Sequence, residues 1–506
     1  MRPRTWVLLL AAVFAVLQLA NVTGRDTPDS KNYLSYALSL SGEGKRGAAA
    51  GAIEHYCASV AASAKRAQSV HVVRFHRADP TAAVTADCRE REWRNVQRRL
   101  ADGQTGGHTV PFMPERFMRI FEVRPGYPLY LVPFVTVLGV TWGVWAASVV
   151  VAVAGGVLVF LILRTLAVSV PLALTGQALY YALPCGTTAM RPMTEGLLLA
   201  LTLTAVWGCA VVLRGGGGGR GAENGGDRGA GGGGARVGGV RAGGVRDGGV
   251  RDACAGLAWA RRARAGGVQG GYAGLARAAQ ARGEGARGAY AGRGQAGQAR
   301  SGYALVGGSL ALLFAVKHSQ ALFLGVCLAA AGAAVALWRH RRGRPPGRDV
   351  LALAATGLGA ALLTAALARL LHYPSESESL QDLLTGHFAR PDRADPWPEF
   401  LQLQGNFWLE WTRRQCREPL FVAALLAGAW GALRRPAFGA FLVGAAFTGI
   451  LTQAGHPDIN IWGERLIVLA WLLPAVGLPL LLEPAGRGRV PRPAQGPTGR
   501  TARAIT

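Results

Sequence analysis

The chain has 506 residues, 50% of them hydrophobic, and a mean hydropathy of +0.22, which favours a polytopic membrane protein over a soluble domain. The formal net charge of +26 does not by itself indicate a nucleic-acid partner. Lysine occurs only at positions 31, 45, 65 and 317, and the remaining basic residues are arginines that accompany a general excess of glycine and alanine.

Hydrophobic runs of helical length follow one another along the chain. They cover residues 5–21, 143–163, 166–184, 196–213, 302–316, 319–338, 350–371, 418–433, 437–452 and 464–482. Each run is compatible with crossing a hydrocarbon layer about 30 Å thick. The sequence therefore predicts an all-α polytopic membrane protein, a bundle of about ten transmembrane helices.

The basic residues fall on one side of these predicted spans. If Arg2 and Arg4 lie in the cytoplasm, the other basic groups lie there too: Arg164, the segment from 214, the cluster 339–348, Arg434 with Arg435, and the tail from Arg487. This distribution agrees with the positive-inside rule. We therefore expect a multi-pass protein of the plasma membrane with both termini in the cytoplasm.

The apolar stretch 127–141 needs a separate interpretation. As a full span it would place the later arginine clusters outside, so we expect a helix that lies at the membrane interface or dips into it. The first run, 5–21, has two interpretations. We favour an uncleaved anchor, and the alternative is a cleaved signal peptide, because the basic start and Leu19-Ala20 also fit that pattern.

This topology divides the chain into four parts. Residues 1–213 form an N-terminal membrane module with an external loop at 22–126, and residues 301–483 form C-terminal helices with an external loop at 372–417. Between them lies a Gly/Arg-rich cytoplasmic insertion, 214–300, and a basic cytoplasmic tail, 484–506, ends the chain. Cys57 and Cys88 lie in the first external loop, where an oxidising exterior permits a disulfide; two free thiols are the alternative.

The insertion contains a tandem Arg-x-Gly-Gly-Val sequence that begins at Arg236, Arg241 and Arg246. A segment of this composition cannot bury a packed core, so we expect it to be disordered. Mobile guanidinium groups also attract phosphates without specificity, which leaves RNA or anionic lipid as an alternative role for the insertion. We expect no specific nucleic-acid partner.

Short motifs occur in a fixed order at the external ends of the spans. They are Asp29-Ser30-Lys31-Asn32-Tyr33-Leu34, Arg124-Pro125-Gly126-Tyr127-Pro128, Pro192-Met193-Thr194-Glu195, Lys317-His318 and Gly463-Glu464-Arg465. This ordered set resembles the GT-C superfamily of membrane glycosyltransferases, which includes protein mannosyltransferases and arabinosyltransferases. The resemblance covers most of the chain outside the Gly/Arg-rich insertion.

The resemblance implies a GT-C-like bundle whose long first external loop contains interfacial helices. It also implies an inverting enzyme that transfers a sugar from a polyprenyl-phosphate donor to an acceptor glycan, lipid or protein on the outer face. An acceptor hydroxyl is a poor nucleophile, so a carboxylate must take its proton. Asp29 is the expected general base, and Asp26 is the second choice.

Negative charge that grows on the leaving phosphate requires cations at the same depth. The expected phosphate-binding residues are Arg124, Lys317 and Arg465, with His318 as a further hydrogen-bond donor. Glu195 is expected to orient the acceptor, to hold a cationic side chain, or to bind a divalent cation together with Asp29. No other cofactor is indicated, because the seven cysteines show no metal-ligand spacing.

Each assignment has an alternative without catalysis. Asp29 also fits the N-cap of a helix over 33–40, and Arg124 and Arg465 also fit as anchors at the headgroup level. For the whole chain, one alternative is a non-catalytic scaffold that tethers partners through the insertion. A transporter is less favoured, because the predicted spans are nearly free of charged residues.

Overall fold

The computed structural model describes residues 2–215, 272–461, 465 and 467–483. All regular secondary structure in these ranges is helical, which confirms the predicted all-α class. The chain divides into two compact units, one of Met1–Gly216 with Arg300–Thr506 and one of Gly217–Ala299. Most of the predicted insertion, 216–271, and the predicted tail, 484–506, lie outside the described residues. The last part of the predicted insertion, 272–300, belongs to a helix that begins at Tyr272.

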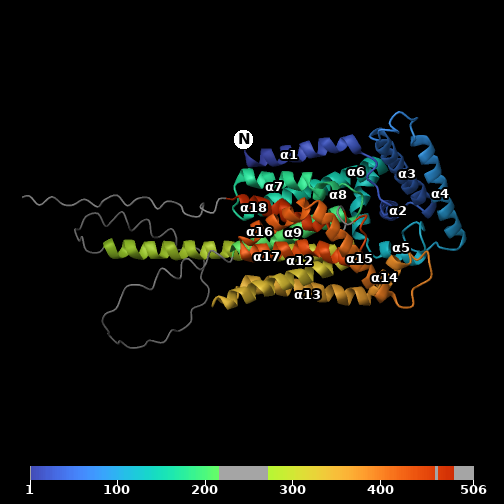
Figure 1. The fold of residues 1–506 in the computed structure, drawn as a ribbon. Coiled ribbons are helices and arrows are strands. Elements are labelled where there is room, and N and C mark those ends of the chain that lie inside the picture. Colours follow the sequence, from blue (N-terminus) through green and yellow to red (C-terminus); the bar gives the residue numbers. More distant parts are fainter. Residues whose placement is uncertain (1, 216–271, 462–464, 466, 484–506) are drawn as a thin grey trace, which may run out of the picture. The chain divides into compact units, whose positions relative to one another are not determined.

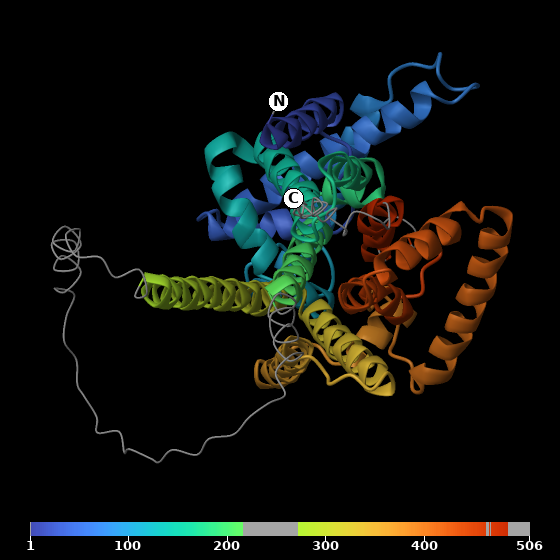
Figure 2. The same ribbon diagram turned by 90° about the vertical axis from the view of Figure 1, so that its left-hand side faces the viewer.

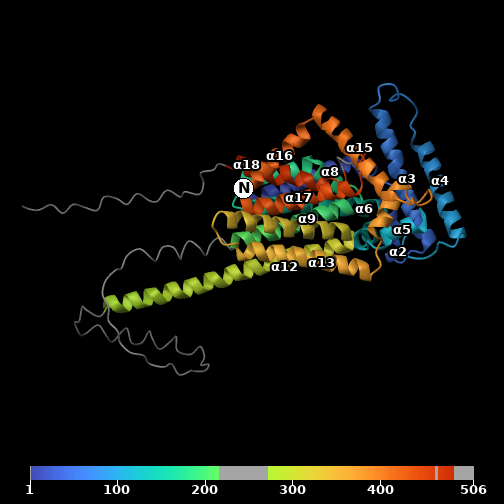
Figure 3. The same cartoon turned by 60° about the horizontal axis from the view of Figure 1, so that its bottom comes forward.

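Six helices in the described ranges are long and apolar enough to cross a membrane. They are α1 (Pro3–Gln18), α6 (Gly126–Thr165), α9 (Thr194–Gly215), α12 (Tyr272–Arg341), α13 (Arg348–Leu370) and α17 (Pro436–Gly455). The bent pair α15 (Pro396–Arg417) and α16 (Leu420–Leu433) adds a seventh candidate if it is counted as one span. These two helices meet at 90°, a bend that is visible in orange in both Figure 2 and Figure 3.

The predicted count of ten is not confirmed, because several predicted runs are realised as shorter elements. The run 166–184 becomes α7 (Val170–Ala182), since the chain turns at Ala167 with a φ of 60° and the extended Leu183 precedes Pro184. The run 418–433 becomes the 14 residues of α16. The run 464–482 is built, in its described part, from three short elements: η4 (Val468–Trp471), η5 (Leu473–Gly477) and α18 (Leu478–Leu482).

Helix α6 is broken at Gly139, which has φ 72° and ψ 171°, a conformation that is open almost only to glycine. After the break the chain returns beside its first part. The Tyr130 hydroxyl donates to the Ala147 carbonyl at 2.8 Å, and a Cβ on Gly143 would lie 2.6 Å from the Phe134 carbonyl oxygen. The predicted separate helix at 127–141 therefore corresponds to the part of α6 before this break.

Helix α12 is broken at Lys317, whose φ of −162° and ψ of 93° are extended. Before the break, Gly302 packs against Gly208 of α9, and after it, Gly325 packs against Gly357 of α13. The apolar stretch Gly297–Arg341 has 45 residues and would measure about 68 Å as one straight helix, more than twice the thickness of a hydrocarbon layer. The two predicted runs 302–316 and 319–338 are thus the two halves of one broken helix.

Four helices of the first predicted loop gather beyond one end of the long apolar helices (Figure 1). They are α2 (Ser30–Leu40), α3 (Lys45–Ser69), α4 (Thr81–Ala101) and α5 (Glu115–Glu122). A disulfide between Cys57 and Cys88 joins α3 to α4, which decides between the two alternatives for these cysteines. Figure 3 shows the same helices at the same end of the bundle.

An aromatic cluster attaches this layer to the long apolar helices. Tyr33 of α2 packs edge-on against Phe121 of α5 and Tyr127 of α6, with ring centroids 5.0 and 5.5 Å apart. All three side chains are buried, and Met193 closes the cluster from the segment before α9. Burial of large aromatic side chains dominates the energetics of such an interface. It orients α2 so that Asp29, just before its first turn, lies beside the start of α9.

Candidate active site

Asp29 lies immediately before α2, at the position of an N-cap residue. Its side chain makes no capping hydrogen bond, so the expected alternative of a simple helix cap is not realised. Instead, the carboxylate accepts a hydrogen bond from Nη2 of Arg465 and forms an ion pair with it. The backbone carbonyl of Asp29 accepts from the amides of Asn32 and Tyr33, so the backbone begins the helix and the carboxylate faces the site.

Arg465 joins Asp29 to a second carboxylate. Its Nε donates to Oε1 of Glu195 at 2.9 Å, while Oε2 of Glu195 accepts from the hydroxyl of Thr194 at 3.2 Å. The Glu195 side chain is 5% exposed, against 21% for Asp29 and 23% for Arg465. A buried carboxylate needs a cationic partner, and the first turn of α9 adds a favourable helix dipole. One guanidinium thus neutralises two acids from distant segments.

The other predicted cations surround this bridge. Lys317, at the break of α12, lies within electrostatic range of Glu195, Asp29, Arg465 and Arg124. Three cations therefore face two carboxylates in one cluster, which leaves an excess of positive charge. Such an excess suits an anionic ligand.

Arg124 and His318 lie at the edge of the cluster. Burial raises the pKa of Tyr33, and the nearby Arg124 guanidinium opposes that rise, which places Arg124 beside α2. Nε of Arg124 is buried without a hydrogen-bond partner in the described part of the chain. His318 lies within electrostatic range of Arg124 and Lys317, and its ring packs 5.0 Å from that of Tyr373.

Asp26, the second choice for the base, makes different contacts. Its carboxylate lies 3.4 Å from Nε2 of His55, and its amide donates to the hydroxyl of Ser59 at 3.1 Å. Both partners belong to α3, and the side chains of Asp26 and His55 are 4% and 3% exposed. The structure therefore separates the two aspartates: Asp29 faces Arg465, whereas Asp26 contacts α3.

A small cleft opens beside the bridge, and we call it the charged cleft. It is lined by Glu195, Leu198, Lys317, Gln320, Thr452, Arg465, Val468 and Leu469. Charged and polar groups come from α9, α12, α17 and the chain before η4, whereas Leu198, Val468 and Leu469 supply an apolar wall. A ligand that fits both surfaces has a charged head and an apolar body.

The segment 374–395, from the second predicted external loop, approaches the same cluster. Nδ1 of His387 donates to Oδ1 of Asp382 at 3.1 Å, and the carboxylate raises the pKa of the imidazole, with Asp29 adding to the effect from a longer distance. Burial lowers the pKa of His456, which lies within range of Arg465, Lys317 and Asp382. His387 and His456 had no role in the sequence-based prediction, and the structure places both near the cluster.

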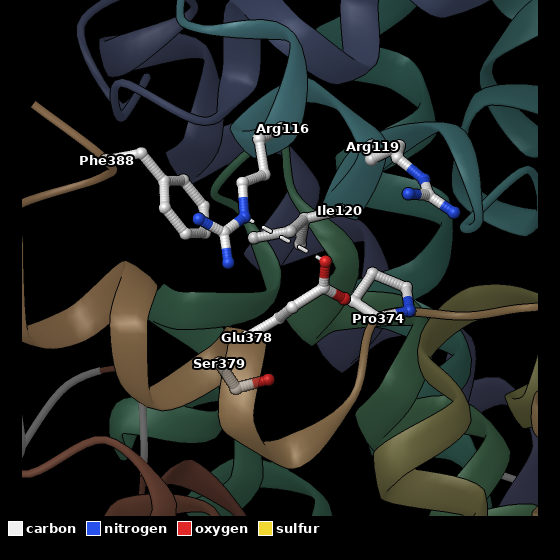
Figure 4. Close-up of a pocket in the computed structure, with 7 residues that line it drawn as sticks. All are labelled: Arg116, Arg119, Ile120, Pro374, Glu378, Ser379 and Phe388. Carbon is white, nitrogen blue, oxygen red and sulfur yellow. Dashed lines mark ion pairs between the residues drawn. The ribbon is translucent and has the colours of Figure 1, made fainter. Parts of the chain in front are cut away.

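Arg116 of α5 holds this segment in place (Figure 4). Its guanidinium donates to both carboxylate oxygens of Asp392 at 2.7 and 2.8 Å, and it lies 4.3 Å from the centre of the Phe388 ring. Glu378 lies 3.9 Å from it, and both residues line a small pocket. Because these partners already occupy the guanidinium, this pocket is a junction between α5 and the segment 374–395.

The carboxylates that could share a divalent cation, Asp29 and Glu195, both contact Arg465. A guanidinium therefore lies where a bridging metal was one of the expected alternatives. Within the described ranges, no group of three or more His, Cys, Asp or Glu side chains is arranged to hold a metal ion.

Sequence reasoning missed two polar residues of the charged cleft, Gln320 and Thr452. A signal for Gln320 existed, since it is an amide inside an apolar run and follows Lys317 by three residues. It also missed the buried pair of Lys31 and Glu92, which lie 2.5 Å apart and tie α2 to α4. Nothing in the local sequence links these last two residues, because they are 61 positions apart.

Comparisons with protein-family models, with curated proteins and with solved structures found no match for this chain. The chemistry of the site is therefore the basis for a functional proposal.

Proposed function

We propose that this protein is a GT-C-type membrane glycosyltransferase that moves a sugar, with inversion, from a polyprenyl-phosphate donor to an acceptor on the outer face of the plasma membrane. One observation carries the proposal. A single guanidinium, Arg465, is shared by Asp29 and Glu195 beside Lys317, at a cleft with one charged side and one apolar side. This arrangement suits a lipid that ends in a phosphate.

The reaction follows from competition for Arg465. A donor phosphate that approaches the cleft competes with Asp29 for the guanidinium, and its binding releases the Asp29 carboxylate. Asp29 then takes the proton of the acceptor hydroxyl as the hydroxyl oxygen attacks the anomeric carbon. The bond from the anomeric carbon to the phosphate oxygen breaks, and the phosphate leaves as an anion stabilised by Arg465, Lys317 and Arg124.

The proposal includes the predicted membrane topology. Ten crossings result if the two halves of α12, the short α7, the α16 helix and the segment from 468 to 482 each cross or enter the bilayer. The layer of α2–α5 would then lie outside, where its disulfide is chemically stable, with the first part of α6 at the interface and both termini in the cytoplasm. The disulfide supports this orientation.

The proposal is tested by Asp29→Asn in membranes that contain the protein. Membranes are incubated with undecaprenyl phosphates carrying radiolabelled mannose, glucose or arabinose, and label transferred to endogenous acceptors is counted. We expect a loss of at least about 100-fold with unchanged protein level, since a general base contributes about that much or more. The matched control is Asp87→Asn, an exposed acid of α4, which should transfer as wild type. Equal transfer by both variants would remove Asp29 from the mechanism.

A transporter is the second candidate, because α6 and α12 are broken helices and such breaks are common at transport sites. The transporter and the proposed enzyme are distinguished in proteoliposomes that contain no acceptor. A transporter moves labelled substrate across the bilayer there, whereas the proposed enzyme shows no flux. A scaffold that acts through the insertion would show no transfer even as wild type, and would lose its function when 214–300 are deleted.

A further inference from the structure

The lining of the charged cleft contains a buried, uncharged side chain, Gln320, with one polar end that has no hydrogen-bond partner in the described part of the chain. Gln320 is 1% exposed and lies on α12, three residues after Lys317. The hydroxyl of Thr452 bonds to its Oε1 at 3.0 Å, whereas its Nε2 has no hydrogen-bond partner in the described part of the chain. Thr452 therefore holds one end of the amide, and the other end remains unsatisfied at the cleft.

A buried amide group costs free energy unless something completes its hydrogen bonds. Thr452 cannot complete both ends, because its oxygen also lies 2.9 Å from the carbonyl of Thr448 on its own helix. Exchanging the amide oxygen and nitrogen of Gln320 leaves the same result, with one end bound and one end free. The observation thus points to a ligand group at this position.

We propose that Gln320, positioned by Thr452, binds a hydroxyl group of the donor sugar and so contributes to the choice of sugar. This inference rests on the proposed function. A hydroxyl both donates and accepts, so it satisfies the free amide end in either orientation. The phosphate is better matched to the cations Lys317 and Arg465, which form charge-assisted bonds to its oxygens.

The relative positions of these groups support the assignment. In a sugar phosphate lipid the sugar is bonded directly to the phosphate, so a group that reads the sugar must lie next to the phosphate-binding cations. Gln320 meets this requirement, since it lines the same cleft as Lys317 and Arg465. The apolar wall of Leu198, Val468 and Leu469 remains for the lipid chain.

The test compares two lipids on purified full-length protein in nanodiscs: undecaprenyl monophosphate, and the same phosphate carrying mannose, glucose or arabinose. For the sugar that wild type binds best, we expect Gln320→Leu to weaken binding about tenfold or more, the effect of one lost hydrogen bond with a stranded partner. Binding of the bare monophosphate should change by less than about twofold. Selectivity among the three sugars should fall in the same variant.

A structural role is distinguished by stability and by a second variant. Because Gln320→Leu removes an unsatisfied polar group, its Tm should not fall below that of wild type. Thr452→Val should also weaken binding of the sugar-bearing lipid, but by a smaller factor than Gln320→Leu. The control is Thr364→Val, at a buried threonine of α13, which should leave the binding of both lipids unchanged.

The outcomes separate this inference from the proposed function. If Gln320→Leu weakens the binding of both lipids equally, or of neither lipid, the proposed role of Gln320 in binding the sugar is overturned while the proposed function stands. A lower Tm with unchanged binding likewise makes Gln320 a structural residue. If wild type binds neither lipid, the proposed function and this inference fail together.

Discussion

Asp29 and Arg465 are 436 positions apart in the chain and form an ion pair at the end of the helix bundle. The same guanidinium also holds Glu195. This single side chain therefore connects the start of α2, the start of α9 and the chain that precedes η4. Its removal should affect both stability and the proposed chemistry.

Arg465→Ala leaves Asp29 and the buried Glu195 without their shared cation. We expect a loss of about 3 kcal/mol in the free energy of unfolding, because an unpaired buried charge remains. The exposed Arg94, which pairs loosely with Glu90 at 3.8 Å, is the control, and Arg94→Ala should change stability by less than about 0.5 kcal/mol. Unfolding in detergent measures both.

A second substitution shows whether charge is the cause. Adding Glu195→Gln to Arg465→Ala removes one of the two unpaired acids and should recover part of the lost stability. Equal stability of the single and double variants would mean that Arg465 acts through packing, not through its charge.

The buried pair of Lys31 and Glu92 should control the position of Asp29. The Lys31 amine lies 2.5 Å from the Glu92 carboxylate, and the two side chains are 9% and 8% exposed. The amine also lies about 5 Å from the ring centres of Tyr56 and Phe112. Glu92→Gln leaves a buried charge alone and should cost about 3–5 kcal/mol. Replacing both residues with methionine should restore most of that stability.

A comparable change on the surface serves as the control. Glu54, which pairs with Arg89 on an exposed face, is 59% exposed, so Glu54→Gln should leave the unfolding transition unchanged. If Glu92→Gln also unfolds like wild type, α2 is held by its apolar contacts and not by the ion pair.

The disulfide and the topology can be tested together by labelling. In intact cells treated with a membrane-impermeant maleimide, we expect the exposed Cys416 of α15 to react at once and Cys57 and Cys88 to react only after reduction. Cys254, in the predicted cytoplasmic insertion, should not react. Mass spectrometry of the labelled peptides provides the measurement. Labelling of Cys254 in intact cells would reverse the proposed orientation.

Loss of the disulfide should also reduce stability. Cys57→Ser removes the cross-link between two cysteines that are 31 positions apart, so the unfolded chain is no longer constrained. The expected loss in the free energy of unfolding is about 3 kcal/mol. Cys416→Ser, a change at a free and exposed cysteine, is the matched control and should have no effect.

The apolar runs predicted where the long helices lie, because burial in lipid or protein requires about twenty apolar residues in sequence. They also predicted the division at Lys317, where a polar pair interrupts two runs. The length of α7 was missed, since its ends depend on Pro184 and on the turn at Ala167, whereas α16 begins two residues later than the predicted run and ends where that run ends. A hydropathy pattern does not register these local backbone effects.

The site was harder to predict than the helices. The motifs singled out Asp29, Glu195 and Arg465, and the structure brings them into contact. The partner of each residue could not be predicted, because such pairs join segments hundreds of positions apart and no local periodicity encodes them. The same limit explains why Gln320 and Thr452, whose contact spans 132 positions, were missed.

The contact between His387 and Asp382 should make the segment 374–395 sensitive to pH. Asp382 raises the pKa of His387 above its ordinary value of 6.5, so the folded segment favours the protonated imidazole. The stabilisation is complete below about 6.5 and is lost as the pH rises through the higher pKa of the folded state. Hydrogen exchange over 374–395, corrected for intrinsic rates, should therefore show weaker protection at pH 8.5 than at pH 6.

His387→Gln removes the titrating group and should give equal protection at both pH values. The control is His71→Gln, at an exposed residue after α3, which should behave as wild type. Protection in wild type that rises with pH would contradict the assignment, because it would require the neutral imidazole to be the form that holds the segment.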